Sequence, residues 1–254
     1  MNDRQTVEGF FYEERDQMTR IAAKSILTCV RGEVCQFDSV LDVGCGVGTW
    51  LSVASELGAS VCEGIEGPWV RTGSHLVVDS DTITVANLES EWSLARKYDL
   101  GICLEVAEHL STEAGDRLVE TLANHCDAVL FSAAIPGQGG NGHINEQWPR
   151  YWQERFRRYN REAIDLVRPL FFEDEEIPWW YRQNTVVFVK RKLLEKYVNQ
   201  ISSDPLSRSL PLLPLRLTPH TVGASSGRNS NAPHSSLAGT RKRLIRWLSS
   251  RMRG

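Results

Sequence analysis

The sequence predicts an α/β fold in which a doubly wound, mostly parallel sheet carries helices on both faces. Residues 39–43 form a short apolar segment that leads directly into a glycine-rich turn at residues 44–48, and a segment with helical apolar spacing begins at Thr49. Strand-like and helix-like segments then alternate along the chain, which is the order of parallel β-α-β units. The 254 residues with 41% hydrophobic content suffice for one large core.

The elements can be predicted individually from apolar periodicity. The first segment with helical spacing, residues 6–30, predicts one or two helices. Ser111 is a predicted N-cap, because a serine side chain can accept a hydrogen bond from the first helical turn. We expect strands over residues 39–43, 61–65, 82–86, 98–104, 128–133 and 186–190, and helices over 49–58, 111–124, 146–159 and 161–167.

Composition divides the chain into three parts. Residues 1–200 form the predicted domain, of which residues 1–35 are an N-terminal helical segment. Residues 201–240 are rich in Ser, Pro, Gly and Asn, which predicts a disordered linker. Residues 241–254 form a short basic tail with apolar residues at helical spacing.

Charge and cysteine usage narrow the partners and the compartment. The net charge is −3, but residues 201–254 hold nine Lys/Arg against one Asp, so the preceding 200 residues are acidic. An acidic body argues against a specific nucleic-acid partner, while the basic tail is a candidate contact with an anionic membrane surface. Six cysteines without a CxxC pair, and an N-terminus without an apolar signal segment, predict a cytoplasmic protein, peripheral to the inner membrane if the tail binds there.

The glycine turn and its neighbouring acids predict a nucleoside site. A nicotinamide-binding GxGxxG motif beginning at Gly44 would require glycine at position 49, where this chain has Thr49. Asp42 stands at the approach to the turn, where it would repel a pyrophosphate but suit a positively charged sulfonium. Glu66 ends the second predicted strand, where a carboxylate can accept both ribose hydroxyls. The alternative is a tight turn with an unrelated surface Glu.

Three segments resemble the motifs of class I S-adenosylmethionine (AdoMet)-dependent methyltransferases: VLDVGCGVGTW at 40–50, GIEG at 64–67 and YDLGICLEVAEHL at 98–110. The resemblance implies a seven-stranded Rossmann-like domain that binds AdoMet. It implies that Asp42, the turn residues and Glu105 surround the methionine part and the methyl donor, while Glu66 holds the ribose. The implied cofactor-binding set is Asp42, Gly44, Cys45, Gly46, Gly48, Glu66, Asn87, Leu88 and Glu105.

Two positions depart from this family pattern or extend it. Members usually carry Asp-Leu after the third strand for the adenine amino group, whereas this chain has Asn87-Leu88, and Asp81 is a second candidate. The N-terminal aromatics Phe10, Phe11 and Tyr12 form a candidate lid over the cofactor, or pack a helix on the core.

Histidines and glutamates after the fourth and fifth strands are the candidate catalytic residues. An alcohol acceptor needs a base, and His109, His143 and Glu108 are candidates. Glu105, Glu108, His109 and His143 also form a workable ligand set for Mg²⁺ or another divalent cation. The E-x-x-E-H spacing is similar to that of ubiquinone-pathway O-methyltransferases and small-RNA terminal ribose methyltransferases, which hold a cation there. The third possibility is that Glu108 and His109 only cap the following helix.

The loop at residues 134–152 combines glycines, amides and aromatic residues, a composition typical of sugar binding. It resembles the corresponding loop of bacterial methyltransferases associated with polysaccharide or nodulation-factor biosynthesis. Trp148 and Trp152 alternatively pack into the core, and residues 179–184 either complete the same pocket or belong to the core. We therefore expect O-methylation of a hydroxyl on a sugar, glycan or other small molecule. The alternatives are N-methylation, another metabolite, a nicotinamide oxidoreductase or a non-catalytic AdoMet-binding protein.

Overall fold

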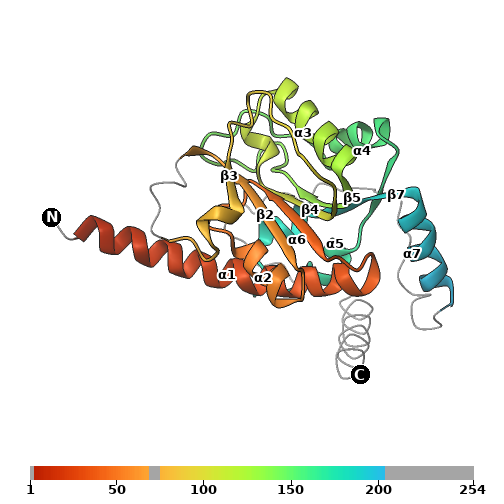
Figure 1. Cartoon of the computed structure of the whole chain (residues 1–254), viewed down its shortest axis with the longest axis horizontal. Helices are drawn as coiled ribbons and strands as arrows, with labels where there is room; N and C mark the ends of the chain where they lie inside the picture. Colours follow the sequence, from red (N-terminus) through yellow and green to blue (C-terminus); the bar gives the residue numbers. More distant parts are fainter. Residues whose placement is uncertain (1–2, 69–74, 204–254) are drawn as a thin grey trace, which may run out of the picture.

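The computed structural model describes residues 3–68 and 75–203, with the side chains of residues 16–68 and 75–200. Within these residues a seven-stranded sheet has the order β3-β2-β1-β4-β5-β7-β6. Strands β1 to β5 are parallel, while β7 runs antiparallel to both β5 and β6. The predicted doubly wound, mostly parallel sheet is therefore confirmed (Figure 1). The strands are β1 (Ser39–Val43), β2 (Val61–Glu66), β3 (Ile83–Val85), β4 (Tyr98–Leu104), β5 (Cys126–Ser132), β6 (Arg161–Ile164) and β7 (Val186–Lys190).

Helices cover both faces of this sheet (Figure 1). On one face α1 packs against α2, and their apolar residues form a core with one side of β1, β4 and β5. On the other face the core includes α3 and the aromatic residues of α4. Alternation along each strand supplies both cores, as expected for parallel strands buried on two sides. The helices are α1 (Asp3–Glu33), α2 (Thr49–Glu56), α3 (Thr112–His125), α4 (Pro149–Arg158), α5 (Val167–Phe171), α6 (Trp179–Asn184) and α7 (Arg191–Ser203), with 3-10 turns η2 (Ser80–Thr82) and η3 (Ala107–His109).

One predicted element is wrong in type. Residues 161–167 were expected to be helical, but Arg161–Ile164 form β6 and a helix begins only at Val167. The strand pairs with β7 along its length, and the buried Arg161 guanidinium donates to the carbonyl oxygens of Ala123 and Asp127. Four residues are too few for periodicity to separate a strand from a helical turn.

The ends of the described region differ from expectation in smaller ways. Residues 3–33 form one continuous helix, and the sheet is followed by α7, whose Tyr197 is buried against the core. The first three residues of the predicted linker continue α7, and the rest of the linker and the basic tail at 241–254 lie outside the described residues. The side chains of the candidate lid, Phe10, Phe11 and Tyr12, also lie outside them. Among the described helices, none is both long and apolar enough to cross a membrane.

Candidate active site

A cavity of about 670 Å³ opens at the carboxyl ends of β1, β2 and β4. This is the edge at which doubly wound sheets bind their ligands. Its wall includes the glycine turn after β1, the end of β2, the segment after β3 and the end of η3, together with residues of α1, α2 and α6. Eight of the nine sequence-predicted cofactor residues line it: Asp42, Gly44, Cys45, Gly46, Glu66, Asn87, Leu88 and Glu105. The ninth, Gly48, does not line it.

The glycine turn has a backbone that side chains would obstruct. Gly44, Gly46 and Gly48 have φ angles of 77°, 58° and 90°, in the left-handed region that favours glycine. A Cβ at Gly44 would lie 2.3 Å from Val106 Cγ2, and one at Gly48 would lie 2.4 Å from Val78 Cγ2. At Gly46 no atom lies within 4 Å of the position a Cβ would take. Gly46 therefore leaves room for a ligand to approach the backbone, whereas Gly44 and Gly48 allow the turn to close.

Two carboxyl groups flank this turn. Glu66 accepts hydrogen bonds from the backbone N–H groups of Gly46 and Gly67, each at 2.7 Å, and so joins the end of β2 to the turn. Asp42 is 2% exposed, and its Oδ2 has no hydrogen-bond partner among the described residues. Burial, with the nearby charge of Glu66, raises the pKa of Asp42 well above its ordinary value. An unpartnered buried carboxyl group beside a cavity fits a ligand that carries positive charge.

The segment after β3 supplies a further part of the wall. Asn87 Oδ1 accepts from the backbone N–H of Glu89 and its Nδ2 donates to Ser90, so the amide stabilises its own turn at the cavity edge. Asp81, the second candidate for the adenine contact, does not line the cavity. Its backbone N–H donates a hydrogen bond to Asp79 Oδ1 at the start of η2. Of the two candidates, the structure brings only Asn87 to the cavity.

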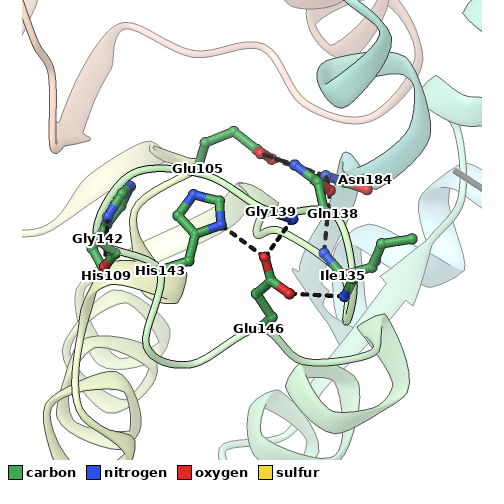
Figure 2. Close-up of polar contacts among 10 residues, drawn as sticks. Glu105, His109, Ile135, Gln138, Gly139, Gly142, His143, Glu146 and Asn184 are labelled. Atoms are coloured by element: carbon green, nitrogen blue, oxygen red, sulfur yellow. Dashed lines mark hydrogen bonds and ion pairs between the residues drawn. The ribbon is translucent and has the colours of Figure 1, made fainter.

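Glu105 is the centre of a polar network that links three elements. Its backbone has φ 57°, unusual for a residue with a side chain. Its carboxylate accepts hydrogen bonds from Gln138 Nε2 at 3.1 Å and from Asn184 Nδ2 at 3.2 Å, and Asn184 also donates to Gln138 Oε1 at 2.9 Å (Figure 2). The network ties the end of β4 to the loop after β5 and to α6. Gln138 belongs to the loop at 134–152 and Asn184 to the segment at 179–184, both of which sequence analysis singled out. Their contact with Glu105 was not predicted.

The two candidate histidines lie against each other. Their rings meet edge to face, with centroids 4.8 Å apart. His109 Nδ1 lies 3.3 Å from the carbonyl oxygen of Gly142, and His143 Nδ1 lies 3.0 Å from Glu146 Oε1 (Figure 2). A carbonyl oxygen and the oxygen of an ionised carboxylate can only accept hydrogen bonds, so both Nδ1 atoms donate. In the neutral imidazoles both Nε2 atoms then carry a lone pair. His109 lines the cavity, whereas His143 does not.

Glu146 holds the loop that carries His143. Besides His143, its carboxylate accepts from the backbone N–H groups of Gly137 and Gly139, each at 2.8 Å. The hydrogen bond from His143, followed by these backbone donors, lowers the pKa of Glu146, although burial opposes them. Gly140 packs on the imidazole so closely that a Cβ there would lie 2.2 Å from His143 Nε2. Sequence analysis did not single out Glu146.

Glu108 is fully buried and does not line the cavity. Its backbone oxygen accepts from Ile144 and Asn145, which fixes η3 to the histidine loop, but neither carboxyl oxygen has a donor among the described residues. Burial, followed by the charge of Glu105, raises its pKa to about 8. Potential ligand atoms of Glu108, His109 and His143 lie within 4.8 Å of one another. Glu105, the fourth predicted ligand, is not part of this group.

Some aromatic residues of the segments at 134–152 and 179–184 lie in the core, and others line the cavity. Trp152 is buried against Phe131, whereas Trp148 is 42% exposed, so the core alternative holds for Trp152 alone. Trp180 and Tyr181 of α6 line the cavity, and Tyr181 meets the ring of Trp50 edge-on at 5.5 Å. Two residues of the segment at 179–184 therefore reach this cavity, whereas no described residue of the loop at 134–152 lines it, so a pocket shared by the two segments stays a prediction.

Fold and site together define a doubly wound domain whose acidic cavity suits a positively charged ligand. A family model described as a methyltransferase domain matches residues 13–181. The chain belongs to this methyltransferase family and is an AdoMet-dependent methyltransferase.

Solved structures share its fold at low identity. DesVI from Streptomyces venezuelae has a TM-score of 0.59 at 16% identity, over 75% of this chain and 99% of that one. CalS10, described as an amino pentose methyltransferase from Micromonospora echinaspora and solved with bound AdoMet, has a TM-score of 0.56 at 14% identity, over 72% and 96%. KedS8, described as a sugar N-methyltransferase from a Streptoalloteichus species, has a TM-score of 0.53 at 17% identity, over 72% and 92%. No curated protein matches the chain.

Proposed function

We propose that this methyltransferase acts on a hydroxyl group of a sugar or a similar small molecule, with His109 as the base. The observation that carries the proposal is the hydrogen bond between His109 Nδ1 and the carbonyl oxygen of Gly142, which leaves the Nε2 lone pair available at the cavity. AdoMet supplies an electrophilic methyl group. Burial, with the nearby His143, lowers the pKa of His109, which keeps the imidazole neutral and ready to accept a proton at neutral pH.

The surrounding residues would bind and orient such an acceptor. Trp180 and Tyr181 offer aromatic faces at the cavity, onto which the CH faces of a sugar ring can stack. Glu105 adds hydrogen-bonding capacity next to them, because its carboxylate has acceptor sites beyond the two amides. Structures of similar fold include proteins described as sugar methyltransferases, which supports the same acceptor class.

N-methylation of an amino sugar is the second candidate. The described residues that line the cavity include Asp16, Asp42, Glu66 and Glu105 but no Lys or Arg, which favours a cationic acceptor over an anionic one. Two of the similar structures are described as acting on amino sugars or sugar nitrogen.

A labelled-methyl assay with matched sugars that carry a hydroxyl or an amine at the same carbon separates the two candidates. For a hydroxyl acceptor, we expect His109→Gln to lower kcat by roughly 10²–10⁴-fold while the AdoMet Kd stays unchanged, because a general base contributes about that much. The wild-type rate should rise with pH at a midpoint below 6.5, since the pKa of His109 lies below that ordinary value. Methylation of the amine alone, or an undiminished kcat in His109→Gln, would contradict the proposal.

A divalent-cation site at the same residues is the alternative to His109 acting as a base. Glu108 is an unpartnered buried carboxyl group, and both imidazoles have Nδ1 engaged, one by a carboxylate and one by a carbonyl, as metal-binding histidines usually do. These residues fit a cation held by Glu108, His109 and His143, which would orient the acceptor oxygen and favour its ionised form.

Chelation tests this arrangement. If a cation is held there, we expect EDTA to abolish acceptor methylation and added Mn²⁺, Zn²⁺ or Mg²⁺ to restore it, and Glu108→Gln to lower the metal content of the purified protein. Full activity in EDTA, with no metal found by elemental analysis, leaves His109 acting as a simple base.

A further inference from the structure

The N-terminal helix α1 contributes a carboxylate to the cofactor cavity. Asp16 lines the cavity and accepts a hydrogen bond from the hydroxyl of Thr49, the first residue of α2. Arg20 lies nearby, with its Nε 3.9 Å from Asp16 Oδ2, but its other guanidinium nitrogens bind Glu56 and Ser52. Asp16 is thus held in place by Thr49, and its negative charge is only weakly compensated.

The position of Asp16 can be related to the shape of AdoMet. Adenine and the methionine chain leave the ribose from opposite sides. If the ribose lies at Glu66 and adenine beside Asn87, as the family motifs imply, the methionine chain would run along the glycine turn toward Thr49, which also lines the cavity. Thr49 follows directly after that turn, and its hydroxyl contacts Asp16. The methionine end of the ligand and Asp16 therefore meet at the same side of the cavity.

The start of α2 provides the complementary charge. Its N-cap is Gly48, and no side chain caps the helix. The first backbone N–H groups of a helix have no partner within it, and they favour a carboxylate. A carboxylate on α1 next to free N–H groups on α2 matches an amino acid zwitterion, which carries one ammonium and one carboxylate.

We propose that Asp16 binds the α-ammonium group of the methionine part of AdoMet, while the N-terminus of α2 receives its α-carboxylate. Helix α1 is then part of the cofactor site, in addition to the Asp42 and glycine-turn contacts implied by the family motifs. The proposal depends on the AdoMet cavity and is independent of which acceptor is methylated.

Calorimetric titration with three ligands tests it. AdoMet and S-adenosylhomocysteine both carry the amino acid part, whereas 5′-methylthioadenosine keeps the adenosine and the sulfur but lacks it. We expect Asp16→Asn to weaken binding of the first two by about tenfold or more, the usual effect of losing a hydrogen bond between charged groups. Binding of 5′-methylthioadenosine should change by less than about twofold, since it has no group for Asp16 to bind.

Two further variants separate this role from a structural one. Glu56→Gln removes a carboxylate from the same α1–α2 contact, but outside the cavity, and should leave all three affinities unchanged. Thr49→Val removes the hydrogen bond that orients Asp16 and should weaken only the two amino acid ligands, by a smaller factor. Unchanged AdoMet affinity in Asp16→Asn, or an equal loss for 5′-methylthioadenosine, would overturn the proposal. Failure to find a methylated sugar would not affect these binding results.

Discussion

Asp99 joins the first residues of β4 to the start of β1. Its Oδ2 accepts hydrogen bonds from the backbone N–H groups of Asp38 and Ser39 and from the Ser39 hydroxyl, each at 2.9 Å. Burial alone would raise the pKa of Asp99, but these three donors and the charge of Arg96 outweigh it and lower the pKa below its ordinary value of 3.8. The carboxylate therefore stabilises the fold in its ionised form.

We expect Asp99→Asn to lower the free energy of unfolding by about 1 kcal/mol at pH 7, a modest value because the group is partly exposed. A carboxyl group whose pKa is lower in the folded state stabilises above its unfolded pKa and loses this effect as the pH falls below about 3.8. Urea denaturation at pH 7 and pH 3 should show the difference between wild type and variant shrinking at the lower pH. Asp81→Asn, at an exposed position, is the control. If the two proteins differ equally in unfolding free energy at pH 7 and pH 3, the ionised state of Asp99 does not contribute to stability.

The residues of the site were predictable where they belong to one local motif. Asp42, the three glycines of the turn and Glu66 could be placed from sequence because they lie at, or just after, the carboxyl ends of two strands, and these ends must meet at one edge of the sheet. The contact of Glu105 with Asn184 spans 79 residues and depends on how α6 docks, which no local pattern encodes. The same holds for Asp16 and Thr49, which are 33 residues apart.

Elements were predictable in proportion to their length and apolar content. Strand β4 occupies Tyr98–Leu104, the predicted residues, because seven nearly continuous buried positions leave few alternatives. Strand β6 has only four residues, of which the first is a buried arginine, so its sequence carries neither strand alternation nor a helical face. Its conformation is imposed by β7, which lies beside it.

At the scale of the whole molecule, the described sheet and the cavity lie within residues 16–190. We expect removal of residues 205–254 to leave the AdoMet Kd unchanged, because the residues described as lining the cavity, with all the sequence motifs implied to bind AdoMet, lie between positions 16 and 181. Sequence analysis makes residues 241–254 the candidate membrane contact, since basic residues alternate there with Leu, Ile and Trp at helical spacing.

Co-sedimentation with vesicles measures that contact. We expect the full chain, but not the truncated chain, to sediment with anionic vesicles at low salt, and neither to sediment with neutral vesicles. Equal sedimentation of both chains would show that the basic tail has no such role.

The order of the last strands has a consequence for how the chain is made on the ribosome. In the described sheet β6 pairs with β7 alone, and β7 is inserted between β5 and β6 although it comes last in the sequence. Until residues 186–190 have emerged from the exit tunnel, β5 has an open edge and β6 has no strand to join. A nascent chain stalled before that point would expose the unpaired N–H and C=O groups of the β5 edge to other chains on the same messenger. Completion of the sheet therefore requires translation of nearly the whole domain.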